Sequence, residues 1–520
     1  MRRNRIAALL LAAALAPLGA QEAIHSNDDI LYDFLALVGK ADRPYLNYKT
    51  LSDSDWDGPE TWRVYGPELF TSFNSSAPYG TNDGPLWQGR GLNSSLTAGL
   101  RFSRYGFEFI YKPQFTFSQN QNFRIMDSAY ESDYGYIWAY SPGAGADAPQ
   151  RFGDELLFDY SWGDSELRYN WKKATIGLGT QSPWLGPGHI NAIMHSNNAP
   201  PYPKLDLGLR RNRITAFGRY LGDIEARLWA GYLSESDYFD SDDSNDHNLI
   251  SGLAVAYAPA ITPGLTFFLN RTYLSPWEAE SAKSLLSLFF VDLSGGGAQD
   301  VWDQRASIGF DYLLSSVGLE IYGELGINDY APSLEAYIRY PFHSMVYLTG
   351  IRKSIAFPNQ SDIKGELIFE WLSLEVSQDY QLQYPASFYM HYQILQGYTN
   401  EGQWIGAGIG TGGNSQYLGL RIYYPRGFSE AFIQRVNPDN DYIYTMAHGT
   451  ANENTETRSK DFRADLSFGI TTAYNFSHRL TISGGLVLVQ MHNQLYYSPS
   501  YGETERTYNF RITTGLQYRF

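Results

Sequence analysis

The last fourteen residues of the chain, TYNFRITTGLQYRF (507–520), alternate strictly between two kinds of side chain. Every second residue counted back from Phe520 is aromatic, aliphatic or threonine, and the residues between them are mostly polar or small. An alternation of period two predicts a β-strand with one apolar and one polar face. The strand is longer than the roughly 9–11 residues that cross a bilayer. Aromatic residues stand near both of its ends, where membrane barrels have their aromatic girdles.

The same alternation recurs in many other parts of the chain. It is clear in residues 95–102, 224–232, 305–312, 319–327 and 462–476, whose polar faces contain charges of both signs. In a membrane barrel such faces point into the lumen. About 450 residues, at about 25 per strand and turn, predict about 16–20 strands, within the known range for these proteins. We therefore expect an all-β fold, a transmembrane antiparallel β-barrel.

The N-terminus and the composition fit this expectation. Residues 1–20, MRRNRIAALLLAAALAPLGA, have a basic start, a short apolar run and a small-residue exit, which predicts a signal peptide. The apolar run is shorter than the roughly 20 residues of a transmembrane helix. The chain has no cysteine, which excludes disulfides, thiolate metal sites and an N-terminal lipid anchor on cysteine. The net charge of −16 disfavours nucleic acid as a partner.

Three domains are expected: the signal peptide 1–20, a periplasmic segment 21–62 and the barrel 63–520. Within the second, residues 28–40 have helical spacing of apolar residues, acidic residues first and Gly-Lys last. Leu31, Phe34, Leu35 and Val38 would form one stripe, and we expect this short helix to pack against the periplasmic mouth of the barrel. Residues 234–246 are acidic, which suggests a solvated loop, with a calcium site as the weaker alternative.

No motif for catalysis, a metal or a cofactor is found, and we expect a protein that is not an enzyme. The glycine run GAGIGTGG (406–413) leads into an alternating strand rather than a helix, so close backbone approach explains it better than nucleotide binding. Carboxylates such as Glu320, Glu324, Glu366 and Glu370 are interpreted as lumen charges balanced by arginines. An outer-membrane enzyme remains an alternative, although no residue is nominated for it.

Two regions rich in Pro, Gly and Asn interrupt the strand pattern. The first contains PWLGPGH (183–189) and SNNAPPYP (196–203), and the second contains GYTNEGQ (397–403) before the glycine run. Such residues fix irregular, hydrogen-bonded segments. On these elements the chain resembles the capsule assembly Wzi family, from about residue 92 to the end. The candidate ligand-binding or lumenal residues in or beside these elements are Trp184, Asn197, Asn198, Arg210, His391, Tyr398, Thr399 and Gln403.

The resemblance implies an outer-membrane barrel of about 18 strands that acts as a lectin and attaches surface polysaccharide. Loops such as YESDYGYIW (130–138) and YYSPSY (496–501) offer mixtures of aromatic and polar side chains suited to sugars, although tyrosine and tryptophan also form membrane girdles. Expected partners are outer-membrane lipid, surface polysaccharide and the barrel insertion machinery, which would recognise the aromatic C-terminal strand. We expect a monomer without cofactors. A porin-like solute channel is the main alternative.

Overall fold

A computed structural model describes residues 26–54, 61–126, 132–136, 146–277, 302–328, 334–339, 341–358, 360, 362–375, 387–442, 462–496 and 506–520. The predicted signal peptide, residues 137–145 and residues 497–505 lie outside these residues. None of the described helices is long and apolar enough to cross a bilayer.

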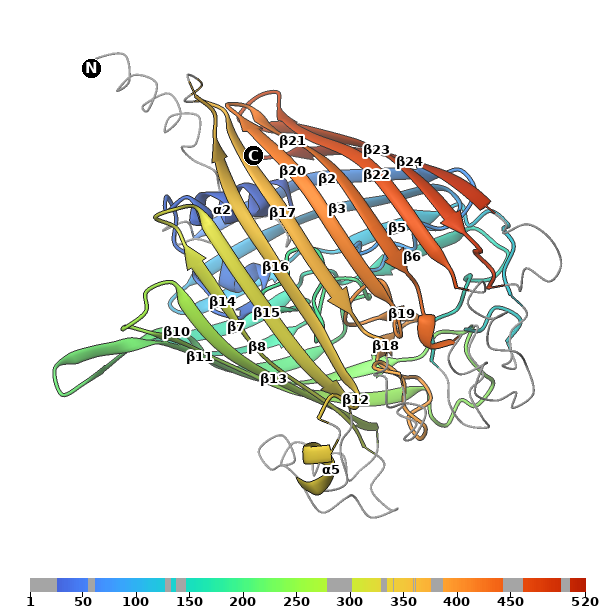
Figure 1. Ribbon diagram of the computed structural model, residues 1–520, viewed down its shortest axis with the longest axis horizontal. Coiled ribbons are helices and arrows are strands. Elements are labelled where there is room, and N and C mark those ends of the chain that lie inside the picture. The colour runs from blue at the N-terminus through green and yellow to red at the C-terminus, as the bar shows by residue number, and fades with distance from the viewer. Residues whose placement is uncertain are drawn as a thin grey trace.

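The described strands form one closed antiparallel barrel (Figure 1). Strand β4 continues into β5 and β6 into β7, each across a short break, so the wall has 18 strands, as the family resemblance implies. The ring closes where β2 pairs with β24 and Thr71 lies opposite Thr514. The wall strands are β2 (Trp62–Asn74), β3 (Gly91–Arg104), β4 (Phe107–Tyr111), β5 (Gln114–Ser118), β6 (Leu157–Ser161), β7 (Glu166–Trp171), β8 (Ala174–Gly179), β10 (Lys204–Ala216), β11 (Arg219–Ser234), β12 (His247–Pro259), β13 (Leu265–Pro276), β14 (Asp303–Leu314), β15 (Leu319–Asn328), β16 (Met345–Ala356), β17 (Lys364–Ser373), β20 (Asn414–Tyr424), β21 (Gly427–Asn437), β22 (Ala464–Asn475), β23 (Leu480–His492) and β24 (Arg506–Tyr518).

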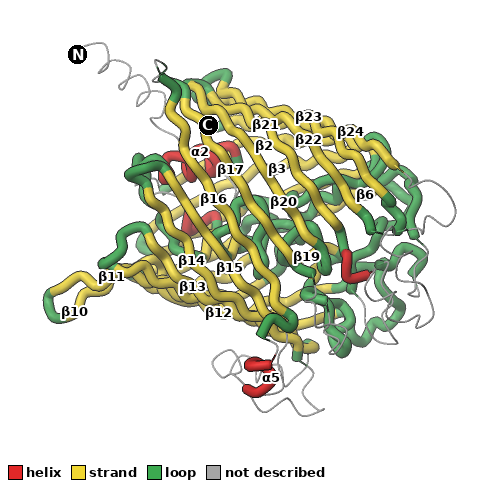
Figure 2. Tube along the Cα trace, in the orientation of Figure 1, coloured by secondary structure: helices red, strands yellow, loops and turns green. Residues whose placement is uncertain are grey.

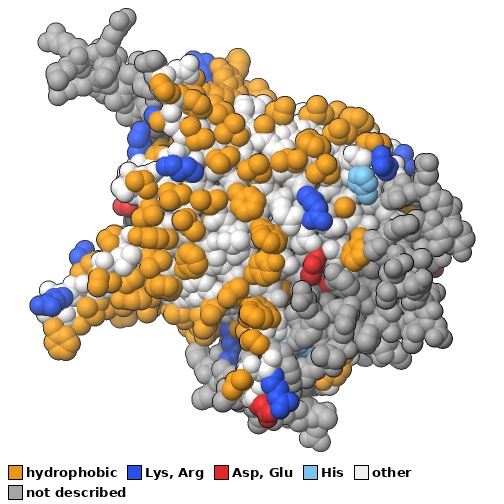
Figure 3. All heavy atoms as spheres, viewed as in Figure 1, with side chains coloured by type: hydrophobic (Ala, Val, Ile, Leu, Met, Phe, Trp, Pro, Cys, Tyr) orange, Lys and Arg blue, Asp and Glu red, His pale blue; other side chains and the backbone are white. Residues whose placement is uncertain are grey.

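The outer face of the wall is apolar. Large side chains such as Leu69, Phe115, Leu486 and Ile512 are exposed there, and hydrophobic atoms cover much of the visible wall (Figure 3). The alternate residues point inward and are mainly polar or charged. This arrangement confirms the predicted strand pattern, and it is the surface of a barrel that spans a membrane.

The two ends of the barrel differ in their connections. At one end the strands are joined by short turns, such as 105–106, 172–173 and 425–426, while the connections at the other end are long (Figure 2). In outer-membrane barrels the short turns are periplasmic and the long loops extracellular. A small helix, α5 (Leu334–Arg339), belongs to one of the long connections.

The predicted N-terminal helix is present as α2 (Asn27–Leu37), and it ends three residues earlier than expected. Ser26 caps its start by accepting a hydrogen bond from the Asp29 amide at 3.3 Å. Phe34 and Leu37 are buried against Tyr423 and other residues of the inner wall, so Leu37 rather than Leu35 completes the apolar stripe. The helix therefore packs inside the periplasmic mouth (Figure 2), as the sequence predicts.

Candidate functional site

The lumen is filled by segments that enter it from both ends. From the periplasmic side come α2, β1 (Tyr48–Lys49) and α3 (Leu51–Ser54). From the extracellular side come residues 180–203 with β9 (Trp184–Leu185), and residues 387–413 with β18 (Thr399–Asn400) and β19 (Gln403–Trp404). Strands β1 and β9 pair with each other, and Tyr48 lies opposite Leu185. Strand β1 and the two extracellular segments pack into an apolar cluster against the inward residues of β11–β13 and β15–β17, here called the packed half of the barrel, whereas α2 packs against β20–β22.

Two carboxylates of the packed half hold the inserted segments by their backbones. Glu370 accepts hydrogen bonds from the amides of His189, Ile190 and Asn191 at 2.7, 3.1 and 2.8 Å. Glu225 accepts bonds from three consecutive amides, 46–48, in the same way. The expectation that arginine balances Glu370 is wrong, because backbone amides and the Tyr322 hydroxyl occupy its oxygens.

Arginines do balance Glu320 and Glu366, whereas the same expectation is wrong for Glu324, which no described arginine contacts. The Arg352 guanidinium lies 2.6 Å from Glu320 and also contacts Glu366, and all three side chains are buried. Arg43 of the N-terminal segment reaches Asp311 at 2.8 Å and Glu320 at 2.6 Å. The N-terminal segment is therefore joined to the wall by charge as well as by apolar contact.

Several candidate residues stabilise the inserted segments. Asn198 accepts a bond from the Asn82 amide at 3.1 Å and donates to the Trp404 carbonyl at 3.0 Å. The Trp184 indole donates to the Gly188 carbonyl at 2.8 Å. Asn198 thus joins the two inserted segments, while Trp184 fixes the turn in its own.

Four other candidates make similar internal contacts. The Tyr398 hydroxyl donates to the Met194 carbonyl and Thr399 to the Gln396 carbonyl, at 2.8 and 2.9 Å. His391 accepts bonds from the amides of residues 393 and 394. Arg210, on β10, donates to the Ser52 carbonyl of α3 at 3.0 Å and therefore contacts the periplasmic segment of the lumen.

The glycine run lies where these segments approach each other most closely. A side chain at Gly406 would meet the Ile193 carbonyl at 2.5 Å, and one at Gly408 would meet Asn198 at 2.5 Å. This confirms the interpretation of the glycines as close backbone contacts.

Two cavities open on the extracellular side, on either side of Trp87. The first, of about 300 Å³, is called the Glu401 cavity because Glu401 lines it; Gln403 of the candidate set also lies there. The second, of about 240 Å³, is called the Arg463 cavity. Trp87 lines both cavities and is half-buried. The remaining candidate, Asn197, lines a third cavity deeper in the lumen.

Aromatic rings form much of the walls of the two outer cavities. In the Glu401 cavity, the rings of Trp87 and Phe152 are 4.9 Å apart, and Phe152 lies 5.7 Å from Tyr238. In the Arg463 cavity, Tyr136 packs edge-on against Trp404 at 5.7 Å. The predicted aromatic loops 130–138 and 496–501 contribute Tyr136 and Tyr496 to this second cavity. The sequence pattern does not predict a role for Trp87, Phe152 and Tyr238, because their loops lack any periodic signal.

The two outer cavities differ in charge. The Glu401 cavity is lined by Asp159, Glu235, Asp237 and Glu401, with no Lys or Arg among its described lining residues. The Arg463 cavity has Arg124 and Arg463 beside one carboxylate, Asp439, and Arg463 also pairs with Asp465 at 2.7 Å. Within the described residues, no group of three His, Asp or Glu side chains is placed to hold a metal ion. The acidic loop 234–246 belongs to these residues.

A buried carboxylate joins the loops beside the Glu401 cavity. Asp147 accepts bonds from the amide and hydroxyl of Ser236, at 2.7 and 2.6 Å, and from the Gly402 amide at 3.1 Å. Burial raises the pKa of Asp147 to about 7, although these hydrogen bonds oppose the shift. The positions of Ser236 and Gly402, and therefore of the adjacent Glu235 and Glu401, depend on this clamp.

Comparison with known proteins places the chain in a family. The family model for "Capsule assembly protein Wzi" matches residues 114–494. The solved structure of Wzi from Escherichia coli, described as an outer-membrane, carbohydrate-binding β-barrel involved in group 1 capsule assembly, superposes with a TM-score of 0.59 at 11% identity, covering 95% of this chain and 98% of that chain.

Outer-membrane channels match more weakly. Pseudomonas aeruginosa OccD3 (OpdP) gives a TM-score of 0.41 at 9% identity, covering 89% of this chain and 92% of that one. Pseudomonas putida OprB gives a TM-score of 0.38 at 9% identity, covering 88% of this chain and 94% of that one. No curated protein matches the sequence. The family model covers most of the chain, and the chain is an outer-membrane β-barrel that belongs to the capsule assembly Wzi family.

Proposed function

We propose that this protein attaches capsule or exopolysaccharide to the cell surface without catalysing a reaction, and that the polymer binds across the two outer cavities. The observation that carries the proposal is the position of Trp87, which lines both cavities at the extracellular end of a filled barrel. Family membership supports the same function. The inserted segments do not support a wide, open porin.

The chemistry of the two cavities suits a saccharide chain. Pyranose rings present apolar faces that pack on aromatic side chains, while a few polar groups fix their orientation. Trp87, Phe152 and Trp404 supply such surfaces, and the carboxylates, arginines and Gln403 supply hydrogen-bonding groups. Two cavities that share one tryptophan would hold neighbouring units of one polymer. Asn197, in the deeper cavity, would contact only a chain that entered the lumen.

The structure of the barrel wall supports the other expected partners, which are membrane lipid and the barrel insertion machinery. The apolar outer face contacts membrane lipid, and the closed ring has no free strand edge to pair with a second copy, which supports a monomer. Phe520 is exposed just beyond the end of β24. It is accessible for recognition of the C-terminal strand by the barrel insertion machinery.

The experiment compares cells that express Trp87→Ala with wild-type cells and with cells that lack the protein. We expect Trp87→Ala to release several-fold more polysaccharide into the medium, with total polymer unchanged, because the shared stacking surface is lost. Tyr392→Ala, which removes an exposed aromatic ring outside both cavities, is the matched control. Equal retention in wild-type and deletion cells would refute attachment; release by both variants would refute the assigned site.

A further inference from the structure

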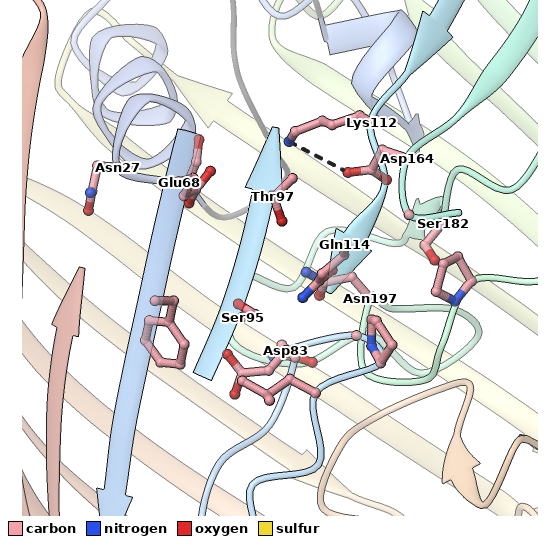
Figure 4. A pocket seen from close by; sticks show the side chains of 18 of the residues that line it. Asn27, Glu68, Asp83, Ser95, Thr97, Lys112, Gln114, Asp164, Ser182 and Asn197 are labelled. Carbon is pink, nitrogen blue, oxygen red and sulfur yellow. Dashed lines mark ion pairs between the residues drawn. The ribbon is translucent and has the colours of Figure 1, made fainter. Parts of the chain in front are cut away.

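The third cavity lies in the lumen beside β2–β8, here called the hollow half of the barrel. Its volume is about 330 Å³, and it lies between the inner faces of β2, β3 and β5 and the inserted segments (Figure 4). Hydroxyl, amide and charged groups line it, among them Glu68, Thr97, Gln114 and Asn197. Ser26 and Asn27, at the start of α2, also line it, so this inner cavity reaches the periplasmic mouth.

The inner cavity and the Glu401 cavity are stacked along the same strand. Gln114 of β5 lines the inner cavity, and the next inward-facing residues of β5, Thr116 and Ser118, line the Glu401 cavity. Pro85 and Leu86 line both cavities. Pro85 and Leu86 therefore lie between the two cavities, and residues 84–86 are here called the partition.

The centre of the partition is apolar, and hydrogen bonds of the flanking residues hold it in place. Leu86 is only 1% exposed. Beside it, the Gly84 amide donates to the Asn197 carbonyl at 2.9 Å, and Gln403 donates to the Gly84 carbonyl at 3.1 Å. A Cβ atom at Gly84 would have no neighbour closer than 3.9 Å. The position of Gly84 thus has space around it, unlike the closely packed positions of Gly406 and Gly408.

The charges on both sides of the partition favour cations. In the inner cavity, Lys112 lies 4.0 Å from Asp164 and Arg511 lies 3.5 Å from Asp83, which leaves Glu68 as an additional negative charge. Beyond the partition, the Glu401 cavity has no basic residue among its described lining, and its acidic side chains include Asp159 and Asp237, whereas burial raises the pKa of Glu235 to about 9 and keeps that side chain neutral at pH 7. Rings and clusters of carboxylates select cations in channels.

We propose that the hollow half is a narrow path for small cations and that Leu86, with Pro85, is the barrier that closes it. A cation would pass from the periplasmic mouth along Glu68 and Thr97 to the partition, and then beside Glu401 to the cell surface. This function differs from polysaccharide attachment in that it uses the inner cavity, and it shares only the Glu401 cavity, at the outer end of the path, with the polymer site.

The test is current recorded in planar bilayers under a KCl gradient. Leu86→Gly should conduct at least five-fold more than the wild type, with a reversal potential that shows preference for K⁺ over Cl⁻. Leu348→Ala, which opens an equally buried position in the packed half, is the matched control and should leave the current unchanged. Equal currents in the wild type and Leu86→Gly, or an equal rise in Leu348→Ala, would overturn the proposal.

A second measurement locates the path. The chain has no cysteine, so a positively charged methanethiosulfonate reagent has no target in Leu86→Gly alone. Adding Thr97→Cys should let the reagent reduce the current by at least half, and an unchanged current would place the path elsewhere. Leu86→Ala, a milder change, replaces Leu86→Gly if the latter does not fold. The recordings contain no polysaccharide, so their outcome is independent of attachment.

Discussion

Inward-facing polar residues line both the packed half and the hollow half of the barrel, but their surroundings differ. In the packed half, inserted segments supply partners for wall charges, as three backbone amides do for Glu370. In the hollow half, similar side chains border a cavity of about 330 Å³. A polar lumen therefore does not by itself determine whether a barrel is open. The inserted segments decide this where they bring partners for the wall.

The largest expected effect is in the packed half. Arg352→Ala would leave Glu320 and Glu366 buried without their shared guanidinium, which costs about 3–5 kcal/mol of unfolding free energy. Arg101→Ala is the matched change in the hollow half, where Arg101 pairs with Glu108 at 3.1 Å and is partly solvated. Because Arg101 is partly solvated while Glu108 is buried, the cost should be smaller than for Arg352→Ala, about 1–3 kcal/mol. Denaturant unfolding in detergent measures both, and equal losses would remove the distinction between the halves.

An intermediate effect, dependent on pH, is expected at the Asp147 clamp above the hollow half. Because burial raises the pKa of Asp147 to about 7, the folded state favours its protonated form. Its contribution to stability is complete below the ordinary pKa of 3.8 and is lost as the pH rises through 7. Relative to Asp147→Asn, the wild type should lose up to about 1.4 kcal/mol for each pH unit between these limits.

Paired melting curves of the wild type and Asp147→Asn across pH 4–8 measure this loss. Asp237→Asn, a change of an exposed acid in the adjacent loop, controls for net charge and should follow the wild type. A constant difference in Tm between the wild type and Asp147→Asn would show that Asp147 does not titrate in this range.

The smallest effect is expected inside the hollow half. Thr97→Val removes a hydroxyl that lines the inner cavity and keeps the shape of the side chain. Surface-like positions of this kind change stability by less than about 0.5 kcal/mol. A loss above 1 kcal/mol in the same unfolding assay would mean that Thr97 is packed against a partner, and that this half is less hollow than we infer.

Much of the fold could be predicted from local pattern. The alternation in residues 507–520 and 462–476 corresponds to β24 (Arg506–Tyr518) and β22 (Ala464–Asn475), because one lipid-facing side imposes period two on each strand. The helix near residue 30 was also predicted, although its end was not. Of the candidate site, Gln403 lies in an outer cavity and Asn197 in the inner one, whereas Trp184 and Tyr398 bond within the inserted segments.

The barrel, its apolar outer face and the irregular segments rich in Pro, Gly and Asn can be inferred from the amino-acid sequence alone, because each of these depends on neighbouring residues in the chain. The folded chain is needed to show that Trp87, Phe152, Tyr238 and Glu401 share a cavity, that Glu370 binds three backbone amides rather than an arginine, and that one half of the lumen contains a cavity. These contacts join residues far apart in sequence. They depend on the position of each inserted segment in the lumen, and the local periodicity of the sequence does not predict that position.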